Sequence, residues 1–302
     1  MRSRYRRIVG LGLSVVDHVY VVDHLRLDES RLRYRERVVQ SGGMIGTSLA
    51  QAALLGCRAQ LLSLHGEDAD GRFVRRALRA AGVDTRRVLR SPGARTTVAV
   101  VLVERRGGER RFLVPDRRAL ERRAPSFDLS AIDRRTLLLV DGHFPAQALR
   151  AVKRARRLGA TVIADLNRPR PDSLALLPYV DYPIVPLEFG AGWAGGDPER
   201  LLRRLRAESR GTPVVTLGAR GGLYLEGGRV RRYRARRVRV VDTTGAGDAF
   251  HGAFAAGLYF GLGLEAALDL AAHAAALNCT ALGGMGRLMT RSELREHLTA
   301  RA

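Results

Sequence analysis

Residues 238–257 constrain the fold most, because three local patterns follow one another there without a gap. Val238, Val240 and Val241 are β-branched, which is typical of a strand. Gly245 and Gly247 then permit a tight turn. The apolar residues after the turn repeat at helical spacing: Ala249, Phe250, Ala253 and Phe254. This order predicts a strand, a glycine turn and a helix whose N-terminus lies at the turn.

The first turn of such a helix suits an anion. Its N–H groups have no partner inside the helix and lie at the positive end of the helix dipole. We expect Gly245, Ala246 and Gly247 to offer these donors, with Asp248 following as an ionised carboxylate. A carboxylate beside an anion site suits phosphoryl transfer to an alcohol, because it can accept the hydroxyl proton. The alternative is an Asp that only caps a core helix.

The whole string Asp-Thr-Thr-Gly-Ala-Gly-Asp-Ala-Phe at 242–250 resembles the C-terminal signature of the ribokinase-like (PfkB) carbohydrate kinases. The resemblance implies a kinase that transfers the γ-phosphoryl group of ATP to a hydroxyl of a monosaccharide or sugar derivative. It implies that Asp248 is the catalytic base and that ATP acts together with Mg²⁺. A monovalent cation such as K⁺ is a further cofactor that the resemblance allows.

The N-terminal part of the chain resembles the sugar-binding half of this family. The first strand-like run ends in glycines and leads to Asp17, which by resemblance binds sugar hydroxyls. Gly42 and Gly43 precede a helical pattern and let the backbone approach a sugar, although a plain tight turn is the alternative reading. Thr47 stands where the family commonly has Asn, and His143 follows a buried strand. We expect these residues to bind the substrate.

Strand-like and helical patterns alternate through the chain, which is typical of a parallel α/β sheet. The clearest unit is a strand-like run at 136–143, a helix at 145–158 and a strand at 161–165. Together with the resemblance, this pattern predicts a ribokinase-like three-layer α/β/α sandwich with a mainly parallel central sheet.

The length of 302 residues suits one large core, so we expect a single kinase domain over residues 1–302. By resemblance, β-rich runs at about 17–40 and 96–114 form a small β-sheet lid over the sugar. Gly107 and Gly108 predict a hairpin turn inside the second run. Members of the family often form dimers through their lids, so a homodimer is an expected partner state.

The nucleotide side is expected from a strand that enters a glycine loop at 213–222, which resembles the family's Thr-x-Gly-x-x-Gly segment. The family's Asn-x-x-Glu element is altered to Pro186-Leu187-Glu188, which leaves Glu188 as the candidate metal residue. A Walker-type kinase is excluded because no Gly-x-x-x-x-Gly-Lys-Ser/Thr string is present. The residues expected to bind nucleotide are Asn167, Thr216, Gly218, Gly221, Thr243 and Asn278.

The net charge of +22 suggests that the protein could bind a polyanion such as nucleic acid. Against this, the charge is almost entirely Arg, with Lys153 as the only lysine, and it is scattered along the chain. We therefore do not expect nucleic acid to be a partner. A non-catalytic, polyanion-binding protein on the kinase fold stays as the alternative from another functional class.

Cys57 and Cys279 are far apart and in no metal or redox spacing, and no run approaches the roughly 20 apolar residues of a membrane span. The basic residues 2–7 lead into the first strand without a cleavage pattern, so we expect an arm rather than a signal peptide, and a cytoplasmic protein without membrane contact.

The identity of the sugar is left open by the sequence. Phe-His-Gly at 250–252 and Cys-Thr at 279–280 resemble the sulfofructose kinase branch of the family. His143, however, stands where an Arg of that branch is expected. A sulfosugar and a nucleoside are therefore alternative substrates within the same family.

Overall fold

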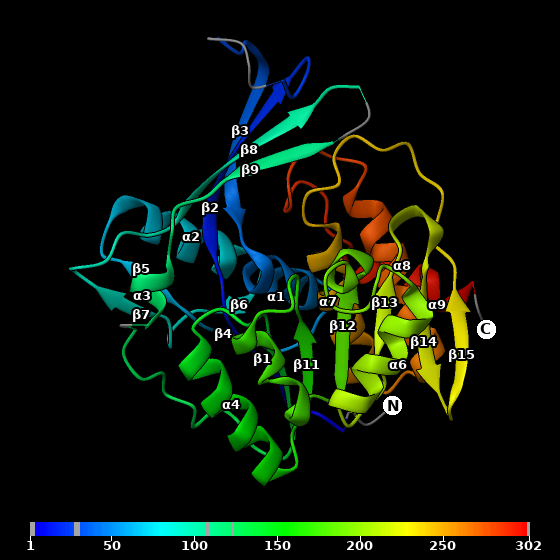
Figure 1. Cartoon of the computed structure of the whole chain (residues 1–302). Coiled ribbons are helices and arrows are strands. Elements are labelled where there is room, and N and C mark those ends of the chain that lie inside the picture. Colours follow the sequence, from blue (N-terminus) through cyan, green and yellow to red (C-terminus); the bar gives the residue numbers. More distant parts are fainter. Residues whose placement is uncertain (1–3, 27–30, 107–108, 123, 301–302) are drawn as a thin grey trace.

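The middle layer of the molecule is a nine-stranded sheet within the residues that the computed structural model describes, which are 4–26, 31–106, 109–122 and 124–300. The strand order is β15-β14-β13-β12-β11-β10-β1-β4-β6. Neighbours from β13 to β6 pair in parallel, whereas β14 and β15 are antiparallel, so the predicted mainly parallel sheet is confirmed (Figure 1). The strands span Arg7–Leu11 (β1), Ala59–Leu62 (β4), Val83–Asp84 (β6), Thr136–Val140 (β10), Thr161–Asp165 (β11), Tyr182–Pro186 (β12), Val214–Thr216 (β13), Gly222–Glu226 (β14) and Arg229–Tyr233 (β15).

Helices cover both faces of this sheet, which completes the predicted three layers (Figure 1). Along β1 and β10, Ile8 and Leu139 pack on one side, whereas Val9 and Leu138 pack on the other. This alternation follows from the period of two in a strand. The first side carries α1 (Met44–Leu54), α2 (Ala69–Ala80), α7 (Ala246–Tyr259), α8 (Leu264–Asn278) and α9 (Arg291–Thr299), and the second carries α4 (Pro145–Leu158) and α6 (Pro198–Glu208).

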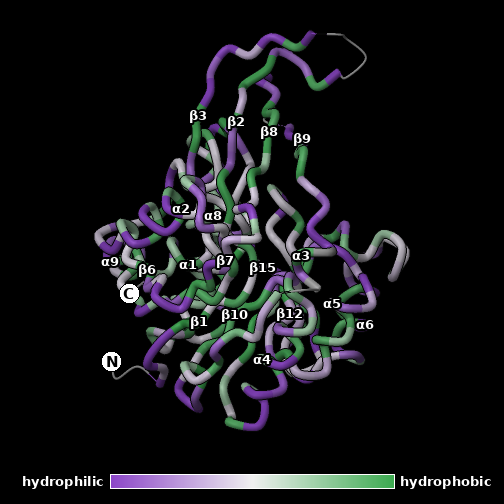
Figure 2. Tube along the Cα trace, turned by 90° about the vertical axis from the view of Figure 1, so that its left-hand side faces the viewer, coloured by the Kyte–Doolittle hydropathy of each residue, from purple (hydrophilic) through white to green (hydrophobic). Residues whose placement is uncertain are grey.

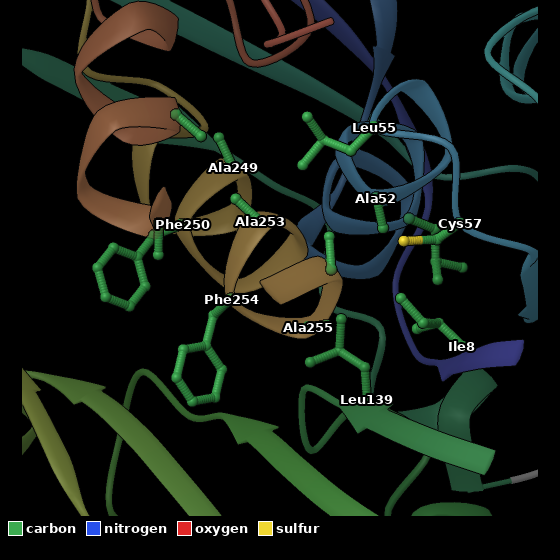
Figure 3. Packing of buried hydrophobic residues seen from close by; sticks show 14 of the residues in the cluster. Ile8, Ala52, Leu55, Cys57, Leu139, Ala249, Phe250, Ala253, Phe254 and Ala255 are labelled. Carbon is green, nitrogen blue, oxygen red and sulfur yellow. The ribbon is translucent and has the colours of Figure 1, made fainter. Parts of the chain in front are cut away.

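Helix α7 is buried on almost every side, which is typical of a helix inside a protein rather than on its surface. All of its residues from 249 to 258 are buried. Figure 3 shows Phe254 directed at the sheet, and its ring meets Tyr182 edge-on at a centroid distance of 5.3 Å. Burying one such side chain stabilises the fold by about 1.5–3 kcal/mol. The helix therefore has little freedom to move once the domain is folded.

A separate four-stranded sheet, here called the lid sheet, rises from the body of the molecule (Figures 1 and 2). Its order is β3 (Tyr34–Gly42), β2 (Val15–Val22), β8 (Val98–Glu104) and β9 (Arg110–Leu113). The β-rich runs at 17–40 and 96–114 thus form the expected small sheet. Residues 27–30 and the predicted turn glycines at 107–108 lie outside the described residues.

The remaining elements are short or lie beside the sheet. Helix α2 begins at Ala69, because the side chain of Asp68 caps it by accepting the N–H of Gly71 at 2.7 Å. The others are β5 (Leu64–Gly66), β7 (Leu89–Ser91), α3 (Arg118–Arg122), α5 (Pro171–Leu174) and the 3₁₀ turns η1 (Leu177–Tyr179), η2 (Leu187–Gly190) and η3 (Gly218–Arg220).

The strand predicted directly before the glycine turn is wrong. Strand β15 ends at Tyr233, and residues 234–240 form neither strand nor helix. Val240 and Val241 are each 46% exposed, so their β-branched pattern serves no buried strand. Instead, the N–H of Val241 donates to the carbonyl of Cys279 at 2.8 Å, which ties this segment to the end of α8.

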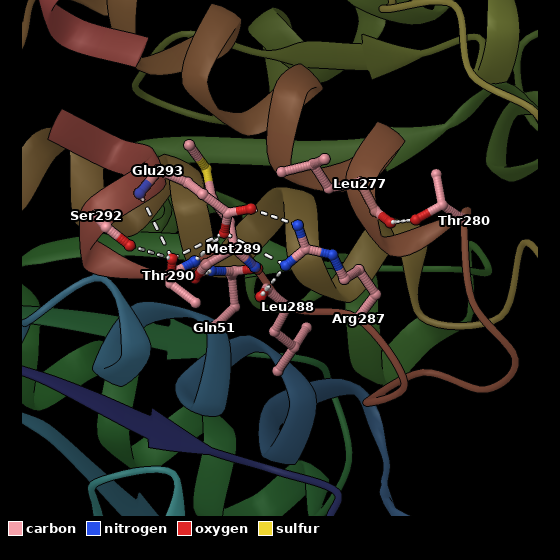
Figure 4. Close-up of polar contacts among 9 residues, drawn as sticks. All are labelled: Gln51, Leu277, Thr280, Arg287, Leu288, Met289, Thr290, Ser292 and Glu293. Atoms are coloured by element: carbon pink, nitrogen blue, oxygen red, sulfur yellow. Dashed lines mark hydrogen bonds and ion pairs between the residues drawn. The ribbon is translucent and has the colours of Figure 1, made fainter. Parts of the chain in front are cut away.

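The loop between α8 and α9 is fastened to α1 (Figure 4). The side-chain amide of Gln51 donates to the carbonyl of Met289 and accepts its N–H, both at 2.9 Å. Thr290 and Glu293 then form a capping box that starts α9. These contacts hold the preceding glycines, Gly283 and Gly284, beside the N-terminus of α7. Among the described residues, no helix is both long and apolar enough to cross a membrane.

Candidate active site

Four carboxylates from separate segments come together at the end of the parallel sheet where β10 and β11 terminate. Asp141 follows β10, Asp165 ends β11, Asp17 lies in β2 and Asp248 lies in α7. The negative charges of the first three all raise the pKa of Asp248, which places them within electrostatic reach of it. In open α/β sheets, ligands bind at this carboxyl edge.

The glycine turn at 242–245 is held by a buried carboxylate. One oxygen of Asp242 accepts the N–H and the hydroxyl of Thr244, both at 2.8 Å. The other oxygen accepts the N–H of Gly283, also at 2.8 Å. Gly245 has a φ of 79°, and a Cβ at this position would overlap the backbone of Gly284. Glycine is therefore required at position 245 both by the backbone conformation and by the close approach of the loop between α8 and α9.

Asp248 is the third residue of α7, so its carboxylate lies at the helix N-terminus as expected. Gly247 before it is exposed, whereas the N–H of Ala246 donates to the carbonyl of Thr243 at 3.3 Å. Burial raises the pKa of Asp248 well above its ordinary value, and the neighbouring carboxylates raise it further. The first turn of α7 thus combines open backbone with a carboxyl group that holds a proton more strongly than usual.

Asp17 is packed against the double glycine. A Cβ at Gly42 would overlap the Asp17 carboxylate, and Gly43, with a φ of 86°, forms the N-cap of α1. Asp17 is only 6% exposed. Burial, aided by the charge of Asp242, raises the pKa of Asp17 to about 7. The strand and the glycine pair therefore hold a carboxyl group that titrates near neutral pH.

His143 belongs to a second polar group at the same edge. Its Nδ1 lies 2.8 Å from the Oε1 of Glu121, and its backbone N–H donates to Asp141 at 2.9 Å. The charges of Asp141 and Glu121 raise the pKa of His143 despite its burial. Arg117 lies 3.4 Å from Glu121, and its guanidinium carbon is 5.6 Å from the centre of the Phe144 ring. The sequence patterns gave no role to Glu121 or Arg117.

Thr47 lies in the first turn of α1 and is buried, with 1% exposure. Its hydroxyl makes no hydrogen bond to any described residue. The hydroxyl of Ser41 beside the glycine pair is likewise buried and unpaired among the described residues. Buried hydroxyls without a partner are costly, which favours a polar ligand as their missing partner.

Most of the residues expected to bind the nucleotide lie in loops that follow strands or precede α7. Thr216 ends β13, Gly218 begins the exposed turn η3, and Gly221 directly follows that turn at the same carboxyl edge of the sheet. Thr243 accepts a hydrogen bond from Arg110 of the lid sheet. Asn167 is exposed beyond β11, with its amide 3.4 Å from the sulfur of Met44.

Asn278 differs from the other residues expected to bind the nucleotide, because its side chain is fully buried. Its amide nitrogen donates to the carbonyl of Gly284 at 2.8 Å and to that of Arg287 at 3.2 Å. Any effect of Asn278 on a ligand would therefore act through the loop that it supports.

Glu188 is exposed in η2, directly after β12. Within the described part of the chain, no three His, Cys, Asp or Glu side chains are grouped so that they could hold a metal ion by themselves. Mg²⁺ that is bound by phosphate oxygens and water needs at most one or two carboxylates, so a single residue such as Glu188 fits that kind of coordination.

Residues 6–291 match the family described as pfkB family carbohydrate kinase. The protein belongs to this family of carbohydrate kinases. The 2-dehydro-3-deoxygluconokinase of Thermoproteus tenax is 34% identical over 82% of this chain and 82% of its own length. The ribokinase of Bacillus subtilis is 29% identical over 85% and 87%.

The fold of this PfkB kinase also matches solved structures. An Arabidopsis thaliana ribokinase, described as complexed with ribose and ATP, superposes with a TM-score of 0.81 at 21% identity. The alignment covers 97% of this chain and 99% of that one. The ribokinase-like fold class predicted from the sequence is thereby confirmed.

Sequence patterns missed several residues of the kinase site. Asp242 was only part of a motif, although it joins the turn to the loop between α8 and α9. His251 was noted without a role, yet its ring lies between α7, the carbonyl of Ile184 within β12 and Asp165 at the end of β11. The available signal was its spacing, since a residue four positions after Gly247 faces the same side of a helix.

Proposed function

We propose that this kinase transfers the γ-phosphoryl group of ATP to a hydroxyl of a monosaccharide or sugar derivative, with Asp248 as the catalytic base. The observation that carries the proposal is the position of Asp248 in the first turn of α7, directly after the exposed Gly247. Family membership supplies the reaction class, and the geometry supports the assignment of the base.

The proposed chemistry follows from the first turn of α7. Asp248 accepts the proton of the sugar hydroxyl while that oxygen attacks the γ-phosphorus, and ADP leaves. The backbone N–H groups of Gly245 and Gly247 face the negative charge that develops on the transferred group. The N–H of Ala246 would join them by exchanging its 3.3 Å contact with the carbonyl of Thr243 for a phosphoryl oxygen. An N–H array at a helix N-terminus is well suited to this, because its dipoles are already oriented before the reaction begins.

On the sugar side, we assign Asp17, Gly42, Gly43, Thr47 and His143 to substrate binding. The unpaired hydroxyl of Thr47 and the packing of Asp17 against Gly42 support this assignment. The acceptor is open to test, since relatives include ribokinases, a fructokinase and a 2-dehydro-3-deoxygluconokinase. A sulfosugar or a nucleoside would be an alternative acceptor at the same site.

On the nucleotide side, the proposed ATP ligands are Asn167, Thr216, Gly218, Gly221 and Thr243, with Asn278 supporting the adjacent loop. The ribose and ATP complex of the Arabidopsis relative supports ATP as the donor. Mg²⁺ would neutralise the phosphates, with Glu188 as its candidate contact, either directly or through water. We further propose a monovalent cation such as K⁺ as an activator.

We propose that residues 1–302 act as one kinase domain and that two copies associate through the lid sheet. Apolar side chains exposed on this sheet support the second statement: Tyr34, Phe112, Leu113 and Val114 are 58%, 49%, 55% and 63% exposed. Sedimentation at increasing concentration tests it, because Phe112→Ser should lower the dimer fraction while leaving the monomer folded.

A polyanion-binding role is the second candidate, and one observation favours it. Two shallow basic hollows lie away from the carboxylate cluster. One is lined by Arg4, Arg134, Arg135 and Gly159. The other is lined by four cationic residues of α4 and by residues 127–130, which include Asp128. A gel shift with DNA and RNA at low salt tests this role, since phosphate contacts weaken steeply as salt rises.

The experiment that tests the main proposal measures ADP formation with Mg²⁺ over a panel of ribose, fructose, 2-dehydro-3-deoxygluconate, sulfofructose and nucleosides. Asp248→Asn should lower kcat by about 10²–10⁴-fold at unchanged ATP affinity. Asp172→Asn, at an exposed carboxylate, is the matched control and should keep wild-type activity. Full activity of the Asp248 variant would overturn the assignment of the base.

A further inference from the structure

His251 is buried beneath the first turn of α7, with 3% exposure. Its Nδ1 lies 2.7 Å from the carbonyl oxygen of Gly247, one turn earlier in the same helix. Its Nε2 lies 3.3 Å from the carbonyl oxygen of Ile184 in β12. The ring therefore spans from the turn that carries the proposed base to the central sheet.

Both ring nitrogens of His251 face acceptors that cannot donate. A carbonyl oxygen only accepts hydrogen bonds, and a neutral imidazole has one donor and one acceptor nitrogen. In the neutral form, one nitrogen lone pair would point at a carbonyl oxygen and leave that contact without a proton. With a proton on each nitrogen, both contacts become hydrogen bonds. The two carbonyl contacts thus favour the imidazolium form over either neutral tautomer.

A carboxylate lies beside the same ring. The Oδ2 of Asp165 is 3.2 Å from Nδ1 of His251, and both side chains are only 4% exposed. This oxygen has no hydrogen bond among the described residues. An unpaired buried carboxylate is costly, so a neighbouring positive charge stabilises it far more than a neutral ring would.

Asp248 needs such a charge as well. The negative charges of Asp165, Asp17 and Asp141 make its ionisation harder, whereas His251 acts in the opposite direction. Burial lowers the pKa of His251 below its ordinary value and is the largest single effect on it, whereas the contacts with Gly247, Asp248 and Ile184 act in the opposite direction. A base that must accept a proton near neutral pH requires the second effect to prevail.

We propose that His251 is a positioning residue, held as an imidazolium between Gly247 and Asp165, that keeps Asp248 ionised among three other carboxylates. This inference rests on the proposed function, because it assumes that Asp248 is the base. The ring also fixes the carbonyl of Gly247, and with it the direction of the peptide that leads into Asp248.

The charged groups around this ring come from three directions. Asp165 faces it from the end of β11, Asp248 lies on its own helix, and β12 presents the backbone carbonyl of Ile184. Asp17 and Asp141 act on Asp248. Removal of the imidazolium therefore leaves negative charge in excess around Asp248 and makes it hold its proton to higher pH.

The first test observes the ring directly. Nitrogen-15 NMR of the full-length protein, labelled at histidine and assigned with His251→Gln, distinguishes an imidazolium from either neutral tautomer at pH 7. Two protonated ring nitrogens are expected for His251. A neutral ring at this pH would overturn the proposal, and this measurement requires neither substrate nor nucleotide.

The second test uses pH–rate profiles of kcat/KM with the best acceptor from the panel. His251→Gln and His251→Asn should move the acid limb of the profile to higher pH by one unit or more. On the plateau above that limb, both variants should reach much of the wild-type kcat/KM. His273→Gln, in α8, is the matched control and should leave the limb unchanged. A uniform loss of rate at every pH, with no shift, would indicate a merely structural role and overturn the proposal.

The two assignments fail in different ways. If Asp248→Asn leaves kcat unchanged, Asp248 is not the base, and the proposed function is rejected together with the role of His251. A different result rejects only the role of His251. In that case the wild type is active, the Asp248 variant is inactive, and the His251 variants show no shift of the acid limb.

Discussion

The hydroxyl of Ser48 in α1 donates a hydrogen bond to the backbone carbonyl of Asp248 in α7, with the two oxygen atoms 2.9 Å apart. The same hydroxyl lies 2.7 Å from the carbonyl oxygen of Met44 in its own helix. Gly252 permits this approach, because a Cβ there would overlap the carbonyl of Ser48. A hydrogen bond from a side chain to the backbone thus joins the proposed sugar-binding helix to the residue proposed as the base.

Ser48→Ala should therefore change turnover more than stability. Loss of one hydrogen bond destabilises the fold by about 1 kcal/mol. The carbonyl of Asp248 loses its contact with α1, so a small displacement of the first turn of α7 should lower kcat by roughly tenfold while the KM for ATP stays near its wild-type value. Steady-state kinetics and urea unfolding of the same preparation measure both effects. An unchanged kcat would contradict the idea that this contact positions Asp248.

Gly42→Ala should weaken sugar binding by displacing Asp17. The added methyl group would overlap the Asp17 carboxylate, which is held in a strand and cannot move far. We expect the KM for the sugar to rise at least tenfold. Gly93→Ala is the matched control, because a Cβ there meets nothing within 4 Å. Equal sugar KM values for the two variants would contradict the prediction, and calorimetric titration with sugar provides an independent check.

The stability of the ligand-free protein should fall between pH 5 and pH 8 because of Asp17. The pKa of Asp17 is raised to about 7 in the folded protein, from an ordinary value near 4. The folded chain therefore holds a proton that the unfolded chain has lost, so stability declines as pH rises through this range. Asp17→Asn should reduce that decline by about 2–3 kcal/mol.

Urea unfolding at a series of pH values measures this difference. Asp172→Asn, which changes an exposed carboxylate, is the control and should follow the wild type. Parallel pH profiles for wild type and Asp17→Asn would contradict the prediction. A stabilised but inactive Asp17 variant at pH 8 would show that the substrate site costs stability.

Gln51→Leu should destabilise the protein more than most single changes. Gln51 is fully buried, and its removal leaves the N–H and the carbonyl of Met289 unpaired. Each unpaired buried group costs about 1–3 kcal/mol, so we expect a loss of about 2–5 kcal/mol in the free energy of unfolding. Gln147→Leu loses a 3.3 Å bond to the carbonyl of Ala124 and a 3.1 Å bond from Arg150. It should cost less, because Arg150 is exposed and water can replace that contact. The reverse order in urea unfolding would contradict this account.

Local patterns predicted the framework of the fold well. The helix at 145–158 and the strand at 161–165 were placed at their observed bounds, because their apolar patterns are uninterrupted. The run predicted at 136–143 forms a strand only as far as Val140, where its apolar residues end. The strand expected around Val240 failed, since β-branched residues describe only a preference, and burial decides whether a strand forms.

The site could be predicted only where a motif is contiguous in the sequence. Asp248 and its glycines lie in one string, so the helix N-terminus and the carboxylate were expected together. The contacts of Asp242 with Gly283, and of Ser48 with Asp248, join residues that no local pattern relates. Periodicity also cannot separate a catalytic position from a supporting one, which is why His251 was read without a role.

The separation of these partners along the chain bears on how the protein is made. Ser48 is 200 residues from Asp248, and Gln51 is 238 residues from Met289. At a synthesis rate of about 5–20 residues per second, α1 leaves the ribosome on the order of tens of seconds before its partners exist. The newly made helix therefore waits with an uncovered apolar face, and chaperone binding during that interval should govern the yield of active enzyme.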